Sequence, residues 1–109
     1  MRPVMYGYAR ITDGTTQNDS IARIRHELTT YADQEGFALG EVFTETAASA
    51  DPAFACMVDA LRRNEVKDII VPSLWHFASL PGLQDAMRLH VERETGARIW
   101  VVQRARSLK

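Results

Sequence analysis

Residues 68–72 read Asp-Ile-Ile-Val-Pro, and this short stretch decides the fold. Its three consecutive β-branched side chains alternate between the two faces of a strand, so both faces are apolar. Strands of this composition occur in sheets that are covered by helices on both sides. The stretch therefore predicts a buried strand at residues 68–72 in an α/β fold.

The chain that follows predicts a loop, a helix and a last strand. Residues 73–79 are expected to form the loop or a short turn. Pro81 suits the first turn of a helix and Gly96 suits its C-terminal end. The helix between them carries apolar residues at helical spacing, namely Leu83, Met87 and Val91. Residues 97–102 then form the last predicted strand.

The chain that precedes residues 68–72 predicts a strand, a helix and a second strand. Residues 4–9 form the first strand, and a polar turn begins at Arg10. The helix ends at Gly36, and its apolar side chains recur at steps of three and four: Ile21, Ile24, Leu28 and Tyr31. Residues 37–44 form the second strand, which Gly40 weakens.

A further helix is expected between the second strand and residues 68–72. Asp51 is a suitable N-cap for it, and Pro52 suits its first turn. Its apolar face consists of Phe54, Met57, Val58 and Leu61. The helix is expected to end near Asn64.

This alternation of strands and helices requires right-handed crossovers and a mostly parallel sheet. We therefore expect a single domain over residues 1–109, with a small three-layer open α/β sheet. In such sheets, ligands and chemistry gather at the carboxyl ends of the strands. That rule selects the candidate site residues before any family is considered: Arg10, Thr12, Ser49, Trp75, His76, Ser79 and Arg104.

Composition narrows the classes of function. A net charge of −1 over 109 residues argues against a protein that binds nucleic acid over its whole surface, because phosphate neutralisation needs clustered Lys and Arg. The single cysteine, Cys56, excludes an internal disulfide and a multi-cysteine zinc site, and it is expected to be a packed thiol. No metal and no cofactor are expected. The sequence shows no signal peptide and no run of about 20 apolar residues, which predicts a cytoplasmic protein without a membrane partner.

The first predicted strand and its loop carry a family signature. The stretch Tyr8-Ala9-Arg10-Ile11-Thr12-Asp13-Gly14 resembles the Tyr-Ala-Arg-Val-Ser-Thr sequence that opens serine recombinases of the resolvase and invertase type. Nearly the whole chain shares this resemblance, through residues 31–37, 43–45, 68–74 and 96–99. The resemblance implies the fold of a resolvase catalytic domain and a link to DNA recombination.

In that family, a serine in the first loop attacks a DNA phosphodiester, and several arginines neutralise the phosphoryl group. Phosphoryl transfer depends on such preorganised positive charge. The resemblance implies that Arg10 matches the arginine of the family signature. It also places Thr12 at the nucleophile position, where the methyl group of threonine crowds the approach of the hydroxyl to a phosphate. No arginine occurs at residues 51–54, where the family carries one.

The largest departure from the family lies at residues 73–79. These residues read Ser-Leu-Trp-His-Phe-Ala-Ser, where the family has Lys-Leu-Asp-Arg-Leu-Gly-Arg. His76 and Ser79 occupy the positions of the two lost arginines. An imidazole with its ordinary pKa of about 6.5 is only partly charged at neutral pH, and a serine carries no charge. Trp75 and Phe77 make this edge more apolar, which fits either a protein contact or packing into the core.

Three hypotheses about function follow from these residues. In the first, the chain is a catalytically inactive recombinase-like domain, a pseudoenzyme with vestigial Arg10 and Thr12. It then acts as a binding or regulatory module, with DNA, a second copy or a recombinase subunit as partner. In the second, Thr12 and Arg10 perform weak DNA strand transfer. In the third, residues 13–16 precede a helix whose amides hold an anion or a nucleotide. The family continues past the last strand into a long helix and a DNA-binding domain, so no C-terminal DNA-binding domain is expected in this chain, which ends at Lys109.

Overall fold

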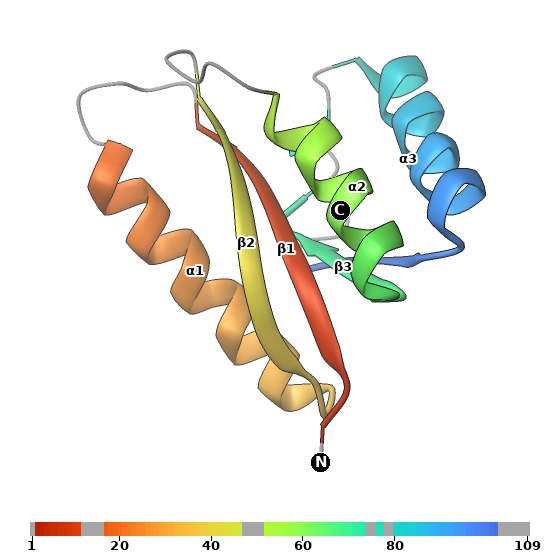
Figure 1. Cartoon of the computed structure of the whole chain (residues 1–109). Coiled ribbons are helices and arrows are strands. Elements are labelled where there is room, and N and C mark those ends of the chain that lie inside the picture. The colour runs from red at the N-terminus through yellow and green to blue at the C-terminus, as the bar shows by residue number, and fades with distance from the viewer. Residues whose placement is uncertain (1, 12–16, 47–51, 74–75, 78–79, 103–109) are drawn as a thin grey trace, which may run out of the picture.

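The computed structural model of the chain describes residues 2–11, 17–46, 52–73, 76–77 and 80–102. Within these ranges four strands alternate with three helices (Figure 1). The elements are β1 (Val4–Ile11), α1 (Gln17–Gln34), β2 (Ala38–Thr46), α2 (Ala53–Asn64), β3 (Asp68–Val71), α3 (Pro81–Thr95) and β4 (Arg98–Val101). Each of these elements was expected from the sequence, and the differences lie at their ends.

The described strands form one sheet in the order β2-β1-β3-β4, and every neighbouring pair is parallel. β1 and β2 pair over most of their length, from Val4 opposite Ala38 to Ile11 opposite Thr46. Parallel strands that follow one another along the chain must be joined by crossovers, and the helices supply them. The prediction of a small, open, mostly parallel α/β sheet is confirmed.

Helices cover both faces of this sheet. α1 lies on one face, and α2 and α3 lie on the other (Figure 1). The buried residues of the core under α1 are Met5, Leu28, Ala32, Phe37 and Ile70. The core on the opposite face is larger and includes Tyr8, Met57, Leu61, Ile69, Val71 and Val91. These two cores establish the three-layer arrangement.

The central position of β3 follows from its composition. All four of its residues are buried. Ile69 and Val71 belong to the core under α2 and α3, whereas Ile70 belongs to the core under α1. The carboxylate of Asp68, at the start of the strand, accepts a hydrogen bond of 2.9 Å from Nε1 of Trp100. This partner offsets part of the free energy that burial of a charge costs.

β1 is two residues longer than the sequence predicts. The sequence predicts a turn from Arg10, yet Arg10 and Ile11 continue the strand and pair with Glu45 and Thr46 of β2. Residues at the end of a strand are stabilised by pairing with the neighbouring strand. The residue pattern of one segment gives no information about that neighbour. As a result, Arg10 is held on a strand with Glu45 as its direct cross-strand partner.

Gly40 lies at an irregularity in the pairing of β1 and β2. The register shifts between Met5 and Gly7 of β1, so that β2 carries one additional residue there. A Cβ atom on Gly40 would lie 3.0 Å from Cγ1 of Val4 and 3.1 Å from Cε1 of Tyr6. The glycine that weakens the strand propensity is thus the residue that allows this close approach.

The ends of α3 agree with the prediction from the sequence, whereas the start of α2 differs from its prediction. Pro81 is in the first turn of α3, and Gly96 caps its end at a φ of 73°, a conformation that favours glycine. α2 begins at Ala53, and Pro52 occupies the N-cap position and not the first turn. Asp51, the predicted N-cap, lies outside the described residues.

Two side chains are more exposed than the sequence predicts. Leu83 is 52% exposed, because the buried residues of α3 lie in its C-terminal half, at Val91 and Thr95. Cys56 is exposed on α2 and is not a packed thiol. The buried residues of α2 are spaced three and four apart, and Cys56 lies outside that series.

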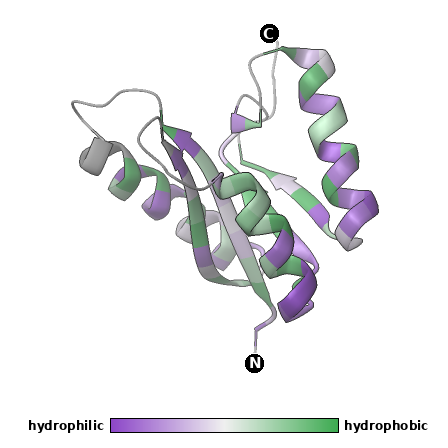
Figure 2. Ribbon diagram, turned by 45° about the horizontal axis from the view of Figure 1, so that its top comes forward, coloured by the Kyte–Doolittle hydropathy of each residue, from purple (hydrophilic) through white to green (hydrophobic). Residues whose placement is uncertain are grey.

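Polar and apolar residues are unevenly distributed along α2. α2 is hydrophobic over most of its length and hydrophilic in its last turn, where Arg62 and Arg63 lie (Figure 2). Within the described ranges, no helix is both long and apolar enough to cross a membrane.

A pair of leucine substitutions tests where the core lies. Leu28→Ala removes a fully buried side chain and is expected to lower the free energy of unfolding by about 2–5 kcal/mol. Leu83→Ala is the matched control at an exposed position, and its cost is expected to stay below about 1 kcal/mol. Equilibrium denaturation in urea measures both losses. Equal losses in the two variants would contradict the packing described for α1.

Candidate functional site

The carboxyl ends of the strands bring three polar side chains to one edge of the sheet. Arg10 and Glu45 are each the next-to-last residue of β1 and β2, and His76 follows the end of β3. Of the candidates selected from the sequence, the structure brings Arg10 and His76 together. The other candidates lie outside the described residues: Thr12, Ser49, Trp75, Ser79 and Arg104.

A hydrogen bond fixes His76 to β1. The backbone N–H of Arg10 donates to Nδ1 of His76 at 2.9 Å. A ring nitrogen accepts through its lone pair, so Nδ1 carries no proton in this arrangement. Burial, and after it the charge of Arg10, lowers the pKa of His76 from 6.5 to about 4, since both disfavour the imidazolium. His76 is therefore neutral at neutral pH.

This protonation state decides what His76 contributes to the edge. The sequence predicts a partly charged imidazole, on the assumption of an ordinary pKa. In the structure, the ring is an acceptor for a backbone amide and carries no charge. A neutral imidazole used in this way does not supply the positive charge of an arginine.

Glu45 is a residue of this edge that the sequence-based selection missed. Its Oε1 accepts the backbone N–H of Phe54 at 3.1 Å, in the first turn of α2. After burial, its charge is the next cause that raises the pKa of Tyr8. The predicted second strand ended at Thr44, which left Glu45 in a loop. The alternation along the strand, which puts Glu45 on the same face as Phe43, is the signal that would have identified it.

Both charges of the edge influence the pKa of Tyr8. Its pKa is raised from 10.0 to about 12, mainly by burial and then by the carboxylate of Glu45, whereas the charge of Arg10 acts in the opposite direction. Tyr8 and Arg10 are two residues apart on β1, so their side chains share a face of the sheet, and Glu45 is the cross-strand partner of Arg10. Tyr8, Arg10 and Glu45 thus form one electrostatic group on the face of the sheet that α2 covers.

Aromatic rings close the inner side of this group. The ring of Tyr8 lies 5.7 Å from that of Phe54 and 5.9 Å from that of Phe77, and the latter two rings are 6.0 Å apart. Phe77 is only 3% exposed, so of the two interpretations left open for it, packing into the core is correct. Trp75, its counterpart in the sequence, lies outside the described residues.

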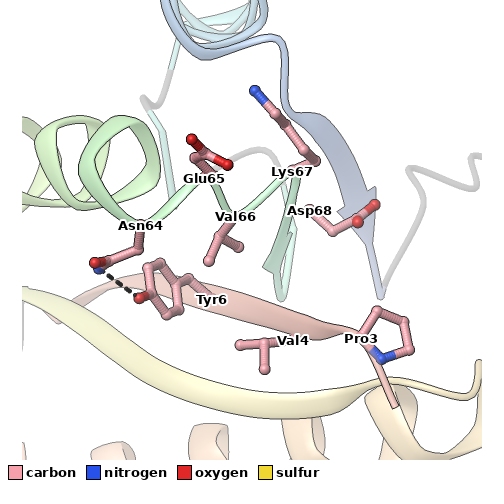
Figure 3. A pocket seen from close by; sticks show the side chains of 8 residues that line it. All are labelled: Pro3, Val4, Tyr6, Asn64, Glu65, Val66, Lys67 and Asp68. Atoms are coloured by element: carbon pink, nitrogen blue, oxygen red, sulfur yellow. Dashed lines mark hydrogen bonds between the residues drawn. The ribbon is translucent and has the colours of Figure 1, made fainter. Parts of the chain in front are cut away.

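A separate hollow lies at the opposite edge of the sheet, at the amino ends of β1 and β3 (Figure 3). It is open, has a volume of about 430 Å³, and is lined by Val4, Tyr6, Asn64, Lys67 and neighbouring residues. The hydroxyl of Tyr6 accepts a hydrogen bond of 2.8 Å from Nδ2 of Asn64 across it. The hollow is at the wrong end of the strands to belong to the edge that carries Arg10.

The described residues provide no ready metal site. Among them, no three His, Cys, Asp or Glu side chains come close enough together to hold an ion.

Comparison with known proteins places this arrangement in a family. A family model described as the resolvase N-terminal domain matches residues 5–107. The chain matches none of the curated proteins with which it was compared.

Several solved structures share the fold. The C-terminal catalytic domain of ISC1926 TnpA, an IS607-like serine recombinase, is similar with a TM-score of 0.76 and 17% identity, over 94% of this chain and 72% of that chain. A serine recombinase from Sulfolobus solfataricus is similar with a TM-score of 0.67 and 18% identity, over 98% of this chain and 72% of that one. The N-terminal catalytic domain of TP901-1 integrase is similar with a TM-score of 0.66 and 16% identity, over 91% and 76% of the two chains. Identities this low show a shared fold and leave the chemistry to be argued from the residues.

The neutral state of His76 predicts a pH dependence of stability. Between pH 6.5 and about 4, the unfolded chain binds a proton at His76 that the folded chain does not bind. The free energy of unfolding therefore falls as the pH is lowered through this window. His76→Asn keeps an acceptor for the N–H of Arg10 but does not titrate, so its unfolding curve is expected to be flatter there. His26→Asn, at an exposed position, is the control and should keep the wild-type slope. Parallel curves for wild type and His76→Asn would contradict the assignment.

The raised pKa of Tyr8 predicts a loss of stability at high pH. The folded chain keeps the phenol protonated up to about pH 12, while the unfolded chain releases the proton near pH 10. Stability that is present below pH 10 is thus lost as the pH rises toward 12. The loss is expected to be smaller in Tyr8→Phe, which has no phenol there, and in Glu45→Gln, which lacks the neighbouring carboxylate. Denaturation at a series of pH values measures this, and an identical alkaline slope in Tyr8→Phe would count against it.

Proposed function

Since the chain belongs to the resolvase N-terminal domain family, that of the serine recombinases, we propose that it is a recombinase-like domain that does not itself cut and rejoin DNA. In this proposal it acts as a binding or regulatory module linked to DNA recombination. The fold supplies the scaffold of the family, and the strand edge differs from the family in its charges.

The hydrogen bond from Arg10 to His76 is the observation that carries the proposal. In a phosphoryl transfer, an arginine at the transferring group is worth roughly 10³–10⁵ in rate. At the position of one such arginine this chain has a neutral imidazole that accepts a backbone N–H. Among the described residues of the edge, the charge of Arg10 stands beside the opposite charge of Glu45. A net positive environment for a pentavalent phosphoryl group is not supported by these residues.

The proposed partners are those that the family implies: DNA, a second copy of the chain, or an active recombinase subunit. A net charge of −1 restricts any DNA contact to a local patch. A domain that keeps the family scaffold with an altered edge is suited to association with a complete subunit, to which it adds contacts without adding chemistry.

The other two hypotheses gain no specific support. Strand transfer by Thr12 and anion binding at residues 13–16 both concern residues outside the described ranges. We therefore keep the inactive module as the proposed function.

A covalent-adduct assay tests this proposal. The purified chain is incubated with supercoiled plasmid, denatured, and analysed for protein joined to nicked DNA. We expect no adduct with the wild-type chain and none with Thr12→Ala, since the charge needed to stabilise the transition state is missing. An active serine recombinase on a plasmid that carries its own site shows that the assay detects adducts. An adduct formed by the wild-type chain and lost in Thr12→Ala would refute the proposal.

A further inference from the structure

The hollow at the amino ends of β1 and β3 is a part of the molecule that the proposed function does not use. It lies where these two strands separate. β1 pairs with β3 at Tyr6 and Gly7, whereas β1 pairs with β2 from Val4 onward and β3 pairs with β4 from Asp68 onward. The amino ends of β1 and β3 therefore face each other without pairing, and the hollow of about 430 Å³ lies between them.

Apolar side chains form one wall of this hollow. Figure 3 shows Val66 directed toward the ring of Tyr6, with Val4 beside them. Val66 is only 9% exposed, whereas Val4 is 44% exposed. A hydrocarbon chain placed in the hollow would remove the apolar surface of Val4 from water, which is favourable.

A nearly buried carboxylate reaches the same hollow. Asp68 is one of its lining residues and is only 8% exposed. Its Oδ1 accepts two hydrogen bonds, one of 2.9 Å from Nε1 of Trp100 and one of 3.3 Å from Nε of Arg98. Its Oδ2 has no hydrogen-bond partner among the described residues. Because buried polar atoms ordinarily have such partners, Oδ2 is an acceptor suited to a donor placed in the hollow.

The charges around the hollow favour a cationic donor. Two carboxylates line it, those of Glu65 and Asp68, and Glu65 forms no ion pair with any described residue. The ammonium group of Lys67 donates to the carbonyl of Thr95 at 3.0 Å, so it faces the C-terminal end of α3, whose dipole offsets its charge. The C-terminal end of α2, at Asn64, adds partial negative charge to the same region.

The number of oxygens that are left selects the kind of cation. A guanidinium group binds a carboxylate best through two parallel hydrogen bonds, and Oδ1 of Asp68 is already bound to Arg98 and Trp100. An ammonium group is a compact point charge, which needs only one carboxylate oxygen. The hollow therefore suits a primary ammonium group on an apolar stem.

We propose that this hollow is a binding site for an aliphatic primary amine. The ammonium group of the amine donates to Oδ2 of Asp68, and its hydrocarbon stem covers Val4 and Val66. Free alkylamines and the lysine side chain share this chemistry. The site lies at the opposite end of the strands from Arg10, so the proposal goes beyond the proposed function and does not depend on it.

A purely structural role for Asp68 makes a different prediction. If its carboxylate only connects β3 to β4, the hollow does not distinguish an amine from a neutral molecule of the same shape. Neutralisation of Asp68 would then change the stability of the chain and leave its affinities for amines and alcohols equal. A comparison of an amine with the alcohol of the same length therefore separates the two roles.

The test compares three full-length chains: the wild type, Asp68→Asn and Asp59→Asn. Asparagine at position 68 keeps an oxygen for the side chain of Trp100 and removes the charge. Asp59→Asn is the matched control, because Asp59 is also paired with an arginine, Arg63, but does not line the hollow.

Each ¹⁵N-labelled chain is titrated at neutral pH with n-butylammonium, and the amide signals of Tyr6 and Val66 are followed by NMR. Titrations with n-butanol and with ammonium chloride supply the stem and the charge separately. We expect the wild type to bind n-butylammonium at least about tenfold more tightly than either of these, with saturable shifts. Asp68→Asn is expected to lose this preference, and Asp59→Asn is expected to keep it.

A lysine derivative distinguishes the two sources of the ammonium group. Nα-acetyl-lysine methylamide carries the lysine side chain between two peptide bonds. If it binds more tightly than n-butylammonium, the site is assigned to a lysine of a polypeptide. Weaker binding assigns the site to free amines, and equal binding assigns it to both. The proposal is overturned if neither amine binds more tightly than n-butanol, or if Asp68→Asn and Asp59→Asn bind the amines equally.

A second variant covers the case in which Asp68→Asn does not fold. Val4 is partly exposed, and threonine keeps its β-branched shape, so Val4→Thr is expected to fold. The hydroxyl replaces a methyl group that the stem of the amine would cover, so the affinity for n-butylammonium should fall by about threefold. An affinity equal to that of the wild type would then overturn the proposal.

Discussion

The burial of β3 on both faces is the constraint from which the rest of the structure follows. A four-residue strand whose side chains are all covered needs helices on both sides, and the crossover helices that provide this cover join parallel strands. Parallel strands end at the same edge of the sheet. The constraint that builds the two cores thus also brings Arg10, Glu45 and His76 together from three separate segments of the chain.

The electrostatics of that edge are set by internal partners. The N–H of Arg10 donates to Nδ1 of His76, and burial of the ring, followed by the charge of Arg10, keeps the imidazole neutral. Glu45 accepts the N–H of Phe54 in the first turn of α2, and it is the cross-strand partner of Arg10 in the strand pairing. The backbone N–H of Arg10, the ring of His76 and the carboxylate of Glu45 are each hydrogen-bonded to another part of the chain. An edge of this kind holds the ends of β1, β2 and α2 in one geometry.

The relation to the serine recombinases is therefore one of shared architecture. The family model spans residues 5–107, and the solved recombinase domains superpose well at identities of 16–18%. Fold is set by the pattern of apolar positions, which tolerates wide substitution as long as volume and periodicity are kept. Phosphoryl transfer depends on a few guanidinium groups in fixed places and does not tolerate their loss. The two requirements separate, so a shared scaffold does not by itself establish a shared chemistry.

The sequence by itself determined the elements, their order and the parallel sheet, because periodic apolar residues such as Leu28 and Val91 and end signals such as Gly96 are local properties of the chain. It also placed Arg10 and His76 at the same edge. The tertiary structure alone decided that β1 continues through Arg10, that Glu45 belongs to the site, and that Leu83 is exposed. It also decided that His76 is uncharged. Each of these depends on a neighbour distant in the sequence: a paired strand, a covering helix, or a backbone N–H that fixes a ring nitrogen. A pattern read along one segment contains no information about such partners.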